Sequence, residues 1–272
     1  MENSVFDVLE ATGRYLKLDI SSVELALLSE EQAFSPSQID AVSYIFEYLR
    51  KKKEDATVQT LLKLSKLPLK NPKTFENFNF SLIKGKDIDR LKALPSLSQI
   101  YAHKNIAFIG PAGTGKTHLA QAIGYECCKR GLKTYFIKMT ELRDRMSAAR
   151  RLGKESALVT SLVRPYCLII DEVGHCDFDK ENTRLFFDFI DRRYHKEGCH
   201  NIIFTSNKHP SQWSSNFQED DTLLCALDRI FDDASVFNIK GESFRGKKLE
   251  TFAIQTNRVV IPDSSEIPPN KD

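Results

Sequence analysis

The stretch Gly110-Pro-Ala-Gly-Thr-Gly-Lys-Thr117 decides the fold. It matches the pattern G-x-x-x-x-G-K-[ST], in which glycines let the backbone curl so that its N–H groups point at phosphate oxygens. Residues 105–109 predict a strand before this loop, and the residues after it predict a helix whose positive N-terminal end faces the phosphates. We therefore predict a Walker A loop that binds ATP with Mg²⁺. Lys116 would reach the β- and γ-phosphates, and Thr117 would offer its hydroxyl to the metal. The predicted cradle consists of Gly110, Pro111, Ala112, Gly113, Thr114, Gly115, Lys116, Thr117 and His118.

A second apolar run, 167–170, ends in the carboxylates Asp171 and Glu172, which is the Walker B arrangement. A strand beside the P-loop strand would carry both acids to the edge of the sheet where ligands bind. Asp171 is then placed to hold the magnesium shell, and Glu172 to orient or deprotonate the attacking water. These residues predict ATP hydrolysis in addition to binding.

Three more polar residues are candidates for the same chemistry. Asn207 follows the apolar run 202–205 and can bond the attacking water or the γ-phosphate from between the two Walker strands. Arg229 and Arg245 lie downstream of the sheet residues. An arginine aimed at a γ-phosphate stabilises the charge of the transition state. The residues alone leave that role open for both arginines.

Short apolar runs alternate with helical stretches from about residue 74. Several of them lack polar alternation, as expected for parallel strands that are covered on both faces. Strands separated by helices form right-handed βαβ units, so we predict a three-layer α/β domain with a parallel sheet. The expected strands are 106–109, 134–137, 167–170, 202–205 and 236–239.

The 272 residues suit one medium domain and a smaller one. Residues 1–67 predict an all-helical N-terminal domain, because apolar residues recur at three- and four-residue steps, as in Val42, Ile45 and Phe46. The lysines 51–53 are expected to close that helix. We expect a linker at 68–73, the ATPase domain at 74–258 and a disordered tail at 259–272.

Composition limits the class of protein. With 41% hydrophobic and 28% charged residues, the chain has the balance of a soluble globular protein, and no apolar run reaches the ~20 residues of a membrane span. The N-terminus shows no signal sequence, so we expect a cytoplasmic protein. The six cysteines include no Cys-x-x-Cys pair, which argues against a zinc site or a disulfide framework.

Positive charge is concentrated in residues 131–154, which contain seven basic side chains and two acidic ones. This local excess indicates a candidate nucleic-acid surface, and a solvated helix face explains it equally well.

With these residues in hand, the sequence resembles the IstB-type helper ATPases of insertion sequences, relatives of the DnaC helicase loaders in the AAA+ class. The resemblance runs from about residue 74 to 248. It is carried by Thr74-Phe-Glu-Asn-Phe-Asn-Phe80, Lys104-Asn-Ile-Ala-Phe-Ile-Gly-Pro-Ala-Gly-Thr-Gly-Lys-Thr-His-Leu-Ala120, Leu168-Ile-Ile-Asp-Glu-Val-Gly174, Asp191-Arg-Arg-Tyr194, Thr205-Ser-Asn207, Leu227-Asp-Arg-Ile230 and Asn238-Ile-Lys-Gly-Glu-Ser-Phe-Arg245.

The resemblance implies an AAA+ domain with a reduced lid and a homo-oligomer with ATP at its subunit interfaces. It implies that Asn207 is sensor 1, Arg229 an arginine finger acting in trans, and Arg245 the sensor 2 arginine. The family's initiator-type helix would fall at about 140–152, within the basic segment. That placement implies DNA contacts by Arg143, Arg145, Arg150 and Arg151.

Two departures from the family pattern stand out. Ala112 replaces a proline that is common in these loops, which is a mild change. Asp232 and Asp233 follow the proposed finger at positions where relatives often have histidines. We expect these acids to be able to pair with Arg229 and hold it back.

Three functions were weighed. The leading hypothesis is a helper that assembles on duplex DNA with ATP and presents a target site to a transposase. The alternative is a DnaC-type loader that grips a replicative helicase and prefers single strands. A neighbouring transposase or primosome gene would separate the two. A small-molecule kinase would need an acceptor pocket and further lid arginines, and fits poorly.

Overall fold

The computed structural model describes residues 4–83, 85–198, 200–218 and 220–241. The predicted tail at 259–272, the end of the ATPase domain with its lid, and Arg245 lie outside the described residues.

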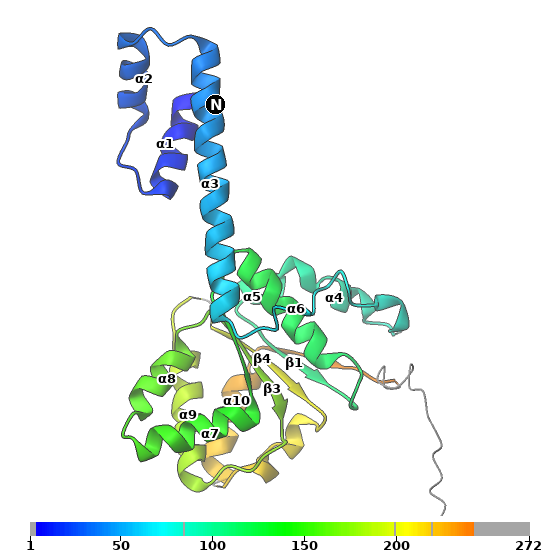
Figure 1. Cartoon of the computed structure of the whole chain (residues 1–272). Coiled ribbons are helices and arrows are strands. Elements are labelled where there is room, and N and C mark those ends of the chain that lie inside the picture. Colours follow the sequence, from blue (N-terminus) through cyan, green and yellow to red (C-terminus); the bar gives the residue numbers. More distant parts are fainter. Residues whose placement is uncertain (1–3, 84, 199, 219, 242–272) are drawn as a thin grey trace, which may run out of the picture.

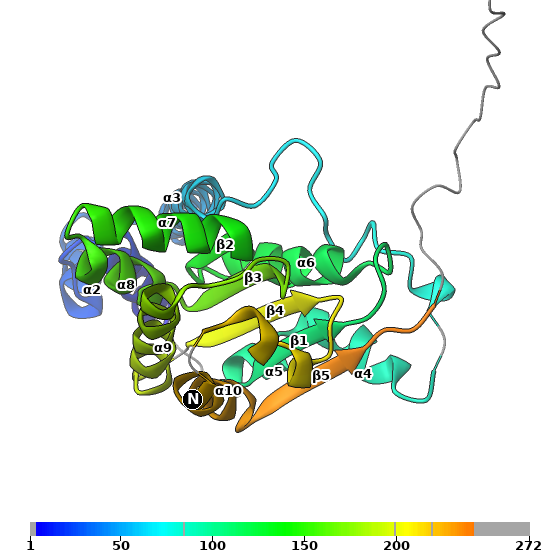
Figure 2. The same ribbon diagram turned by 90° about the horizontal axis from the view of Figure 1, so that it is seen from below.

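The centre of the molecule is a five-stranded, fully parallel sheet (Figure 2). Its strand order is β2-β3-β4-β1-β5. The strands are β1 (Asn105–Ile109), β2 (Thr134–Lys138), β3 (Cys167–Val173), β4 (Asn201–Ser206) and β5 (Ala234–Asn238). The predicted parallel α/β fold is confirmed, with one correction. The Walker B strand β3 is not the neighbour of the P-loop strand β1, because β4 lies between them.

Two hydrophobic cores cover the two faces of the sheet, which gives the three layers. In β3, Leu168 and Ile170 face one core while Cys167 and Ile169 face the other, as the alternation of strand side chains requires. The first core is closed by α7 (Met139–Arg151), α8 (Glu155–Val163), α9 (Lys180–Tyr194) and α10 (Asp220–Phe231). The second is closed by α6 (Lys116–Lys129), α4 (Ile88–Lys92) and α5 (Ser98–Tyr101).

Three helices precede this domain and form what we call the helical arm, residues 5–64: α1 (Val5–Leu16), α2 (Ser22–Glu31) and α3 (Pro36–Leu64). Serines cap the first two, each paired with an acid three residues later in a capping box. The helix α3 projects from the domain, and α1 and α2 lie along its far part (Figure 1).

The prediction that lysines 51–53 end the second helical segment is wrong, because α3 continues to Leu64. Arg50 pairs with Glu47 and Glu54 along this stretch, and such pairs stabilise a helix across positions where charge alone suggested an end. The helix ends at Leu64, and Lys66, two residues later, takes a left-handed φ of 60°.

The C-terminal end of α3 is bonded to the domain that follows it. We call this domain, residues 65–241, the core; it contains both of the hydrophobic cores described above. The N–H of Phe136 donates to the carbonyl of Ser65 at 2.7 Å, and Lys66 pairs with Glu141. Leu67 is buried in the second core. Residues 68–73 then run without a helix or strand. Among the described residues, we find no helix with the length and apolar character that a bilayer crossing requires.

Candidate nucleotide-binding site

The loop 110–117 joins the end of β1 to the start of α6. Gly110 is required by close packing, because a Cβ there would lie 2.0 Å from the carbonyl oxygen of Ile239. Gly115 precedes α6 with a φ of +91°, a conformation that favours glycine. Lys116 is buried, and its Nζ donates to the carbonyl of Pro111 at 2.7 Å. The loop thus curls around its own lysine, as a phosphate cradle does.

The predicted metal ligands meet at the end of the sheet. Asp171 is only 2% exposed, and its Oδ1 accepts hydrogen bonds from Thr117 Oγ1 at 2.8 Å and from Thr205 Oγ1 at 2.5 Å. Hydroxyl and carboxylate oxygens are the donors that Mg²⁺ prefers. Thr205 was not predicted as a site residue. Its signal was its place directly before Ser206 and Asn207 at a strand end.

Glu172 is turned out of the strand by a bulge. The register of β3 with β4 shifts between Ile170 and Val173, and Glu172 has a left-handed φ of 63°. Its N–H donates to Thr205 Oγ1 at 3.0 Å, which holds the turned backbone. Strained backbone of this kind is common at functional sites. The Glu172 carboxylate pairs with Lys138 Nζ at 3.0 Å, a contact that the sequence did not indicate.

Asn207 follows β4 between the two Walker strands. Its Nδ2 lies 3.3 Å from Nε2 of His175, in the turn after β3. Both residues and Glu172 line the same cavity. The structure therefore brings Asn207 and Glu172 together with the P-loop. His175 joins them without having been predicted.

The cavity measures about 900 Å³, within the range of pockets that hold small ligands. One wall is the P-loop, and another is formed by residues from the predicted linker and the start of the predicted domain. That wall is made by Pro68, Asn71, Lys73, Asn77, Phe78 and Asn79.

His118 connects these two walls. Its Nε2 lies 2.8 Å from the carbonyl of Thr74, and its ring meets the Phe78 ring edge-on at 5.0 Å. Burial lowers the pKa of His118 below its ordinary value, so the ring is neutral at pH 7. His118 lines the cavity as predicted for a cradle residue, and it also anchors the segment that covers it.

Arg229 lies away from this cavity, on the last turn of α10. The Nδ2 of Asn105, the first residue of β1, donates to the carbonyl of Ile230 at 2.8 Å, so this turn sits where β1 starts. The expectation that Asp232 or Asp233 pairs with Arg229 is wrong. Asp233 pairs with Lys104 and Asp232 accepts from the Tyr194 hydroxyl, whereas the partner of Arg229 is Asp191 at 3.1 Å.

The four arginines predicted to contact DNA all lie on α7, but most of them have partners within the subunit. Arg143 pairs with Asp144, and Arg145 bonds the Tyr135 hydroxyl. Arg150 ties α7 to α9 through both carboxylate oxygens of Asp179, at 2.9 and 3.0 Å. Arg151 is exposed, with no ion-pair partner within the described part of the chain.

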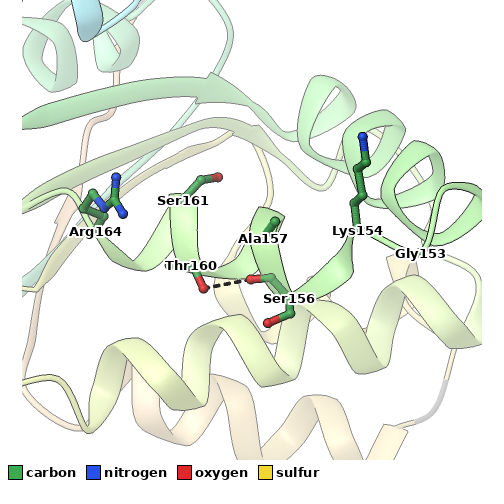
Figure 3. A pocket seen from close by; sticks show the side chains of 7 residues that line it. All are labelled: Gly153, Lys154, Ser156, Ala157, Thr160, Ser161 and Arg164. Carbon is green, nitrogen blue, oxygen red and sulfur yellow. Dashed lines mark hydrogen bonds between the residues drawn. The ribbon is translucent and has the colours of Figure 1, made fainter.

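A second hollow, of about 580 Å³, follows the outer face of α8 (Figure 3). Lys154 and Arg164 stand at its two ends, and small residues line the floor between them. The hydroxyl of Thr160 donates to the carbonyl of Ser156 at 2.8 Å. Lys154 is exposed, as is Arg151 three residues earlier, so the two side chains form one exposed basic surface.

The parallel sheet, the loop after β1 and the two acids near the end of β3 define a P-loop ATPase of the AAA+ class. Solved structures agree. The chain is similar to AMPPCP-bound DnaA from Aquifex aeolicus with a TM-score of 0.50 and 26% identity, over 63% of this chain and 51% of that one. It is also similar in fold to the DnaC helicase loader, with a TM-score of 0.50 and 19% identity, over 62% of this chain and 97% of that one.

Within that class, the chain belongs to the family of IstB-like ATP binding proteins, whose profile matches residues 16–251. A protein of Geobacillus stearothermophilus, named as an ATP-binding protein of insertion sequence IS5376, is 40% identical over 71% of this chain and 75% of its own. A protein of Pseudomonas aeruginosa, named likewise for IS21, is 31% identical over 77% and 78%. The chain is thus an ATPase of insertion sequences.

Proposed function

We propose that this ATPase is a helper of transposition that assembles with ATP on duplex DNA and presents the target to a transposase. The observation that carries the proposal is the separation of Arg229 from its own nucleotide cavity. The five residues of β1 lie between them, and at ~3.3 Å per residue they span about 16 Å, more than an arginine side chain can bridge. An arginine finger at this place can serve only the ATP of a neighbouring subunit.

Hydrolysis would proceed in the cavity at the other end of the sheet. Lys116 would bind the β- and γ-phosphates, and Asn207 would hold the attacking water beside Glu172, which accepts its proton. Thr117 and Asp171 would hold Mg²⁺, whose charge offsets that of the phosphate oxygens. The hydrogen bond between these two side chains supports their assignment to one ion.

Because each site would then draw residues from two subunits, ATP binding would favour assembly, and hydrolysis would loosen it. DNA would contact the exposed basic surface of α7 and α8, with Arg151 and Lys154 at its centre. Such contacts reach phosphates and carry little sequence preference. The names of the relatives, which place them in insertion sequences, support the transposase as the protein partner.

The proposal is tested by titrating labelled DNA with the protein at several salt concentrations. We expect duplex binding with ATP to exceed that with ADP. The double variant Arg151→Glu with Lys154→Glu should weaken binding and flatten its salt dependence by about one unit per lost phosphate contact. Lys92→Glu, an equal change of charge per residue on an exposed side chain of α4, is the control.

Equal binding with ATP and ADP would contradict the proposed assembly. A clear preference for single strands would favour the helicase-loader alternative. If the double variant and the control bind alike, the basic surface of α7 and α8 is only a solvated face.

A further inference from the structure

The side chain of Arg229 is held on almost every side. Its Nε pairs with Asp191 Oδ1 at 3.1 Å, and its Nη1 donates to the carbonyl of Cys225 at 3.0 Å. Its Cζ lies 5.2 Å from the ring centroid of Phe187 and 6.0 Å from that of Tyr194. A surface arginine without a task would lose conformational entropy in such a setting and gain little.

The contacts come from one face of α9. Phe187, Asp191 and Tyr194 follow each other at steps of four and three residues, so they project toward α10 together. The two helices pack side by side at the end of the sheet from which the strands start (Figure 2). The three side chains thus form one platform, which we call the finger platform.

The finger platform is itself anchored. Arg193, between Asp191 and Tyr194, is 1% exposed and donates to the carbonyls of Leu162, Pro165 and Asn201 at 2.9, 3.0 and 2.8 Å. These bonds join the last turn of α9 to the end of α8 and the start of β4. The Tyr194 hydroxyl donates at 2.9 Å to Asp232, the residue directly after α10, and this bond fixes the position of the Tyr194 ring.

The geometry leaves one edge of the guanidinium available. Arginine has five N–H donors; the hydrogen bond to the Cys225 carbonyl uses one of them, on Nη1, while Nε forms an ion pair with Asp191. The second N–H of Nη1 and both N–H groups of Nη2 have no hydrogen-bond partner within the described part of the chain, and the side chain is 29% exposed. They belong to the Nη groups, the pair of nitrogens that binds phosphate in a fork.

The geometry points to Asp191 as a positioning residue: with Phe187 and Tyr194 it aims the Nη edge of Arg229 at the ATP of the neighbouring subunit. This inference rests on the proposed assembly. The alternative, that Asp191 blocks the finger, fits the contacts poorly. Asp191 takes the Nε, whereas a blocking carboxylate would occupy the Nη edge. The pair is also partly exposed, so it is too weak to withhold the arginine from a triphosphate.

The first test is the turnover of Asp191→Asn, which keeps the shape of the side chain and removes its charge. We expect kcat to fall about 10- to 100-fold, the effect of a misplaced catalytic group, while the ATP affinity of each subunit stays unchanged. The matched control is Asp188→Asn, one turn earlier on α9, where the lost partner is Arg192. Assembly is followed by sedimentation, and turnover is compared at protein concentrations where both variants assemble.

The second test separates action in trans from a defect of the subunit itself. Asp191→Asn subunits are mixed with Glu172→Gln subunits, which bind ATP and have an intact finger and platform. We expect turnover to rise above that of either variant alone, because the Glu172→Gln subunit supplies a well-aimed finger to the intact site of its neighbour. The same mixture with Arg229→Ala in place of Asp191→Asn tests the finger alone.

The outcomes are distinct. Recovery in both mixtures supports the inference. Recovery with Arg229→Ala but not with Asp191→Asn overturns the role of Asp191 and leaves the finger in place. Recovery in neither refutes the trans finger of the proposed function, and the inference falls with it. Undiminished kcat in Asp191→Asn alone also overturns it.

Discussion

The helical arm and the core bury their apolar side chains to very different degrees. In the described part of the arm, Leu9 is the single buried hydrophobic side chain, whereas both faces of the sheet in the core are covered by continuous apolar clusters. Large apolar side chains such as Tyr44, Ile45 and Tyr48 are exposed along α3. Because buried apolar area is the main source of stability, the core holds its own fold and the arm depends on helix caps and ion pairs.

Because of this difference, a buried ionisable side chain is a sign of a functional residue only in the core. In the core, Asp171 and Lys116 are ionisable and buried, which is costly, and both lie at the predicted nucleotide site. In the described part of the arm, the buried polar side chains are those of Thr12 and Ser29, and neither is ionisable.

The largest effect is expected at the buried cation of the core. Lys116→Ala should abolish measurable ATP binding in a calorimetric titration, because Lys116 supplies the charge that meets the β- and γ-phosphates. Circular dichroism should show the helices of the arm and the core intact. Lys52→Ala, an exposed lysine of the arm, should bind ATP as the unaltered protein does. Tight binding by Lys116→Ala would refute the cradle.

The two regions can be compared with one residue type. Ile170 is 0% exposed in the core and Ile45 is 54% exposed in the arm. We expect Ile170→Ala to lower the free energy of unfolding by about 2–5 kcal/mol, through lost burial and the cavity left behind. Ile45→Ala should change it by less than about 0.5 kcal/mol. Equal losses in urea unfolding would show that the arm is as well packed as the core.

A smaller effect is expected at the ion pair that holds Glu172. Lys138 and Glu172 are 52% and 40% exposed, so their pair is worth roughly 1 kcal/mol at most. Lys138→Ala should free the carboxylate for the attacking water and raise basal turnover, by up to about fivefold. Lys133→Ala, at the residue directly before the same strand, is the control. A fall in turnover would mean that Lys138 assists Glu172 instead of competing with it.

The smallest effect concerns pH. Burial lowers the pKa of His118, so the unfolded chain takes up a proton at this residue before the folded one does. The free energy of unfolding should therefore fall as the pH drops below the ordinary pKa of histidine, about 6.5. Above that pH, the contribution of neutral His118 to the free energy of unfolding is fully present. His118→Gln should lose part of the pH dependence measured by urea unfolding. An unchanged pH profile would contradict a buried, neutral His118.

The parts predicted correctly from the sequence are those encoded locally. The P-loop and each of the five strands is a single uninterrupted stretch of sequence, so glycine spacing and apolar runs suffice to find them. Lys138, Thr205 and Asp191 were missed as site residues because their roles depend on which strands and helices become neighbours. The order of β4 between β1 and β3 is a tertiary property, and it alone places Thr205 against Asp171.

The remaining differences have the same origin. The length of α3 was underestimated because a run of lysines suggests a helix end, while the pairs of Arg50 with Glu47 and Glu54 become apparent only in the helix. Residues 68–73 were predicted as a linker, yet Pro68, Asn71 and Lys73 line the nucleotide cavity together with residues 77–79 from the start of the domain. These residues reach the cavity because the chain just before them, at Ser65 and Leu67, is fixed to the core.

The most direct test of ATP hydrolysis at this site is the turnover of Glu172→Gln, measured together with bound ATP on the same sample. We expect ATP to stay bound with the affinity of the unaltered protein, while hydrolysis falls by roughly 10²–10⁴, the usual contribution of a general base. Turnover within twofold of the unaltered protein would contradict it, because the water would then be activated elsewhere.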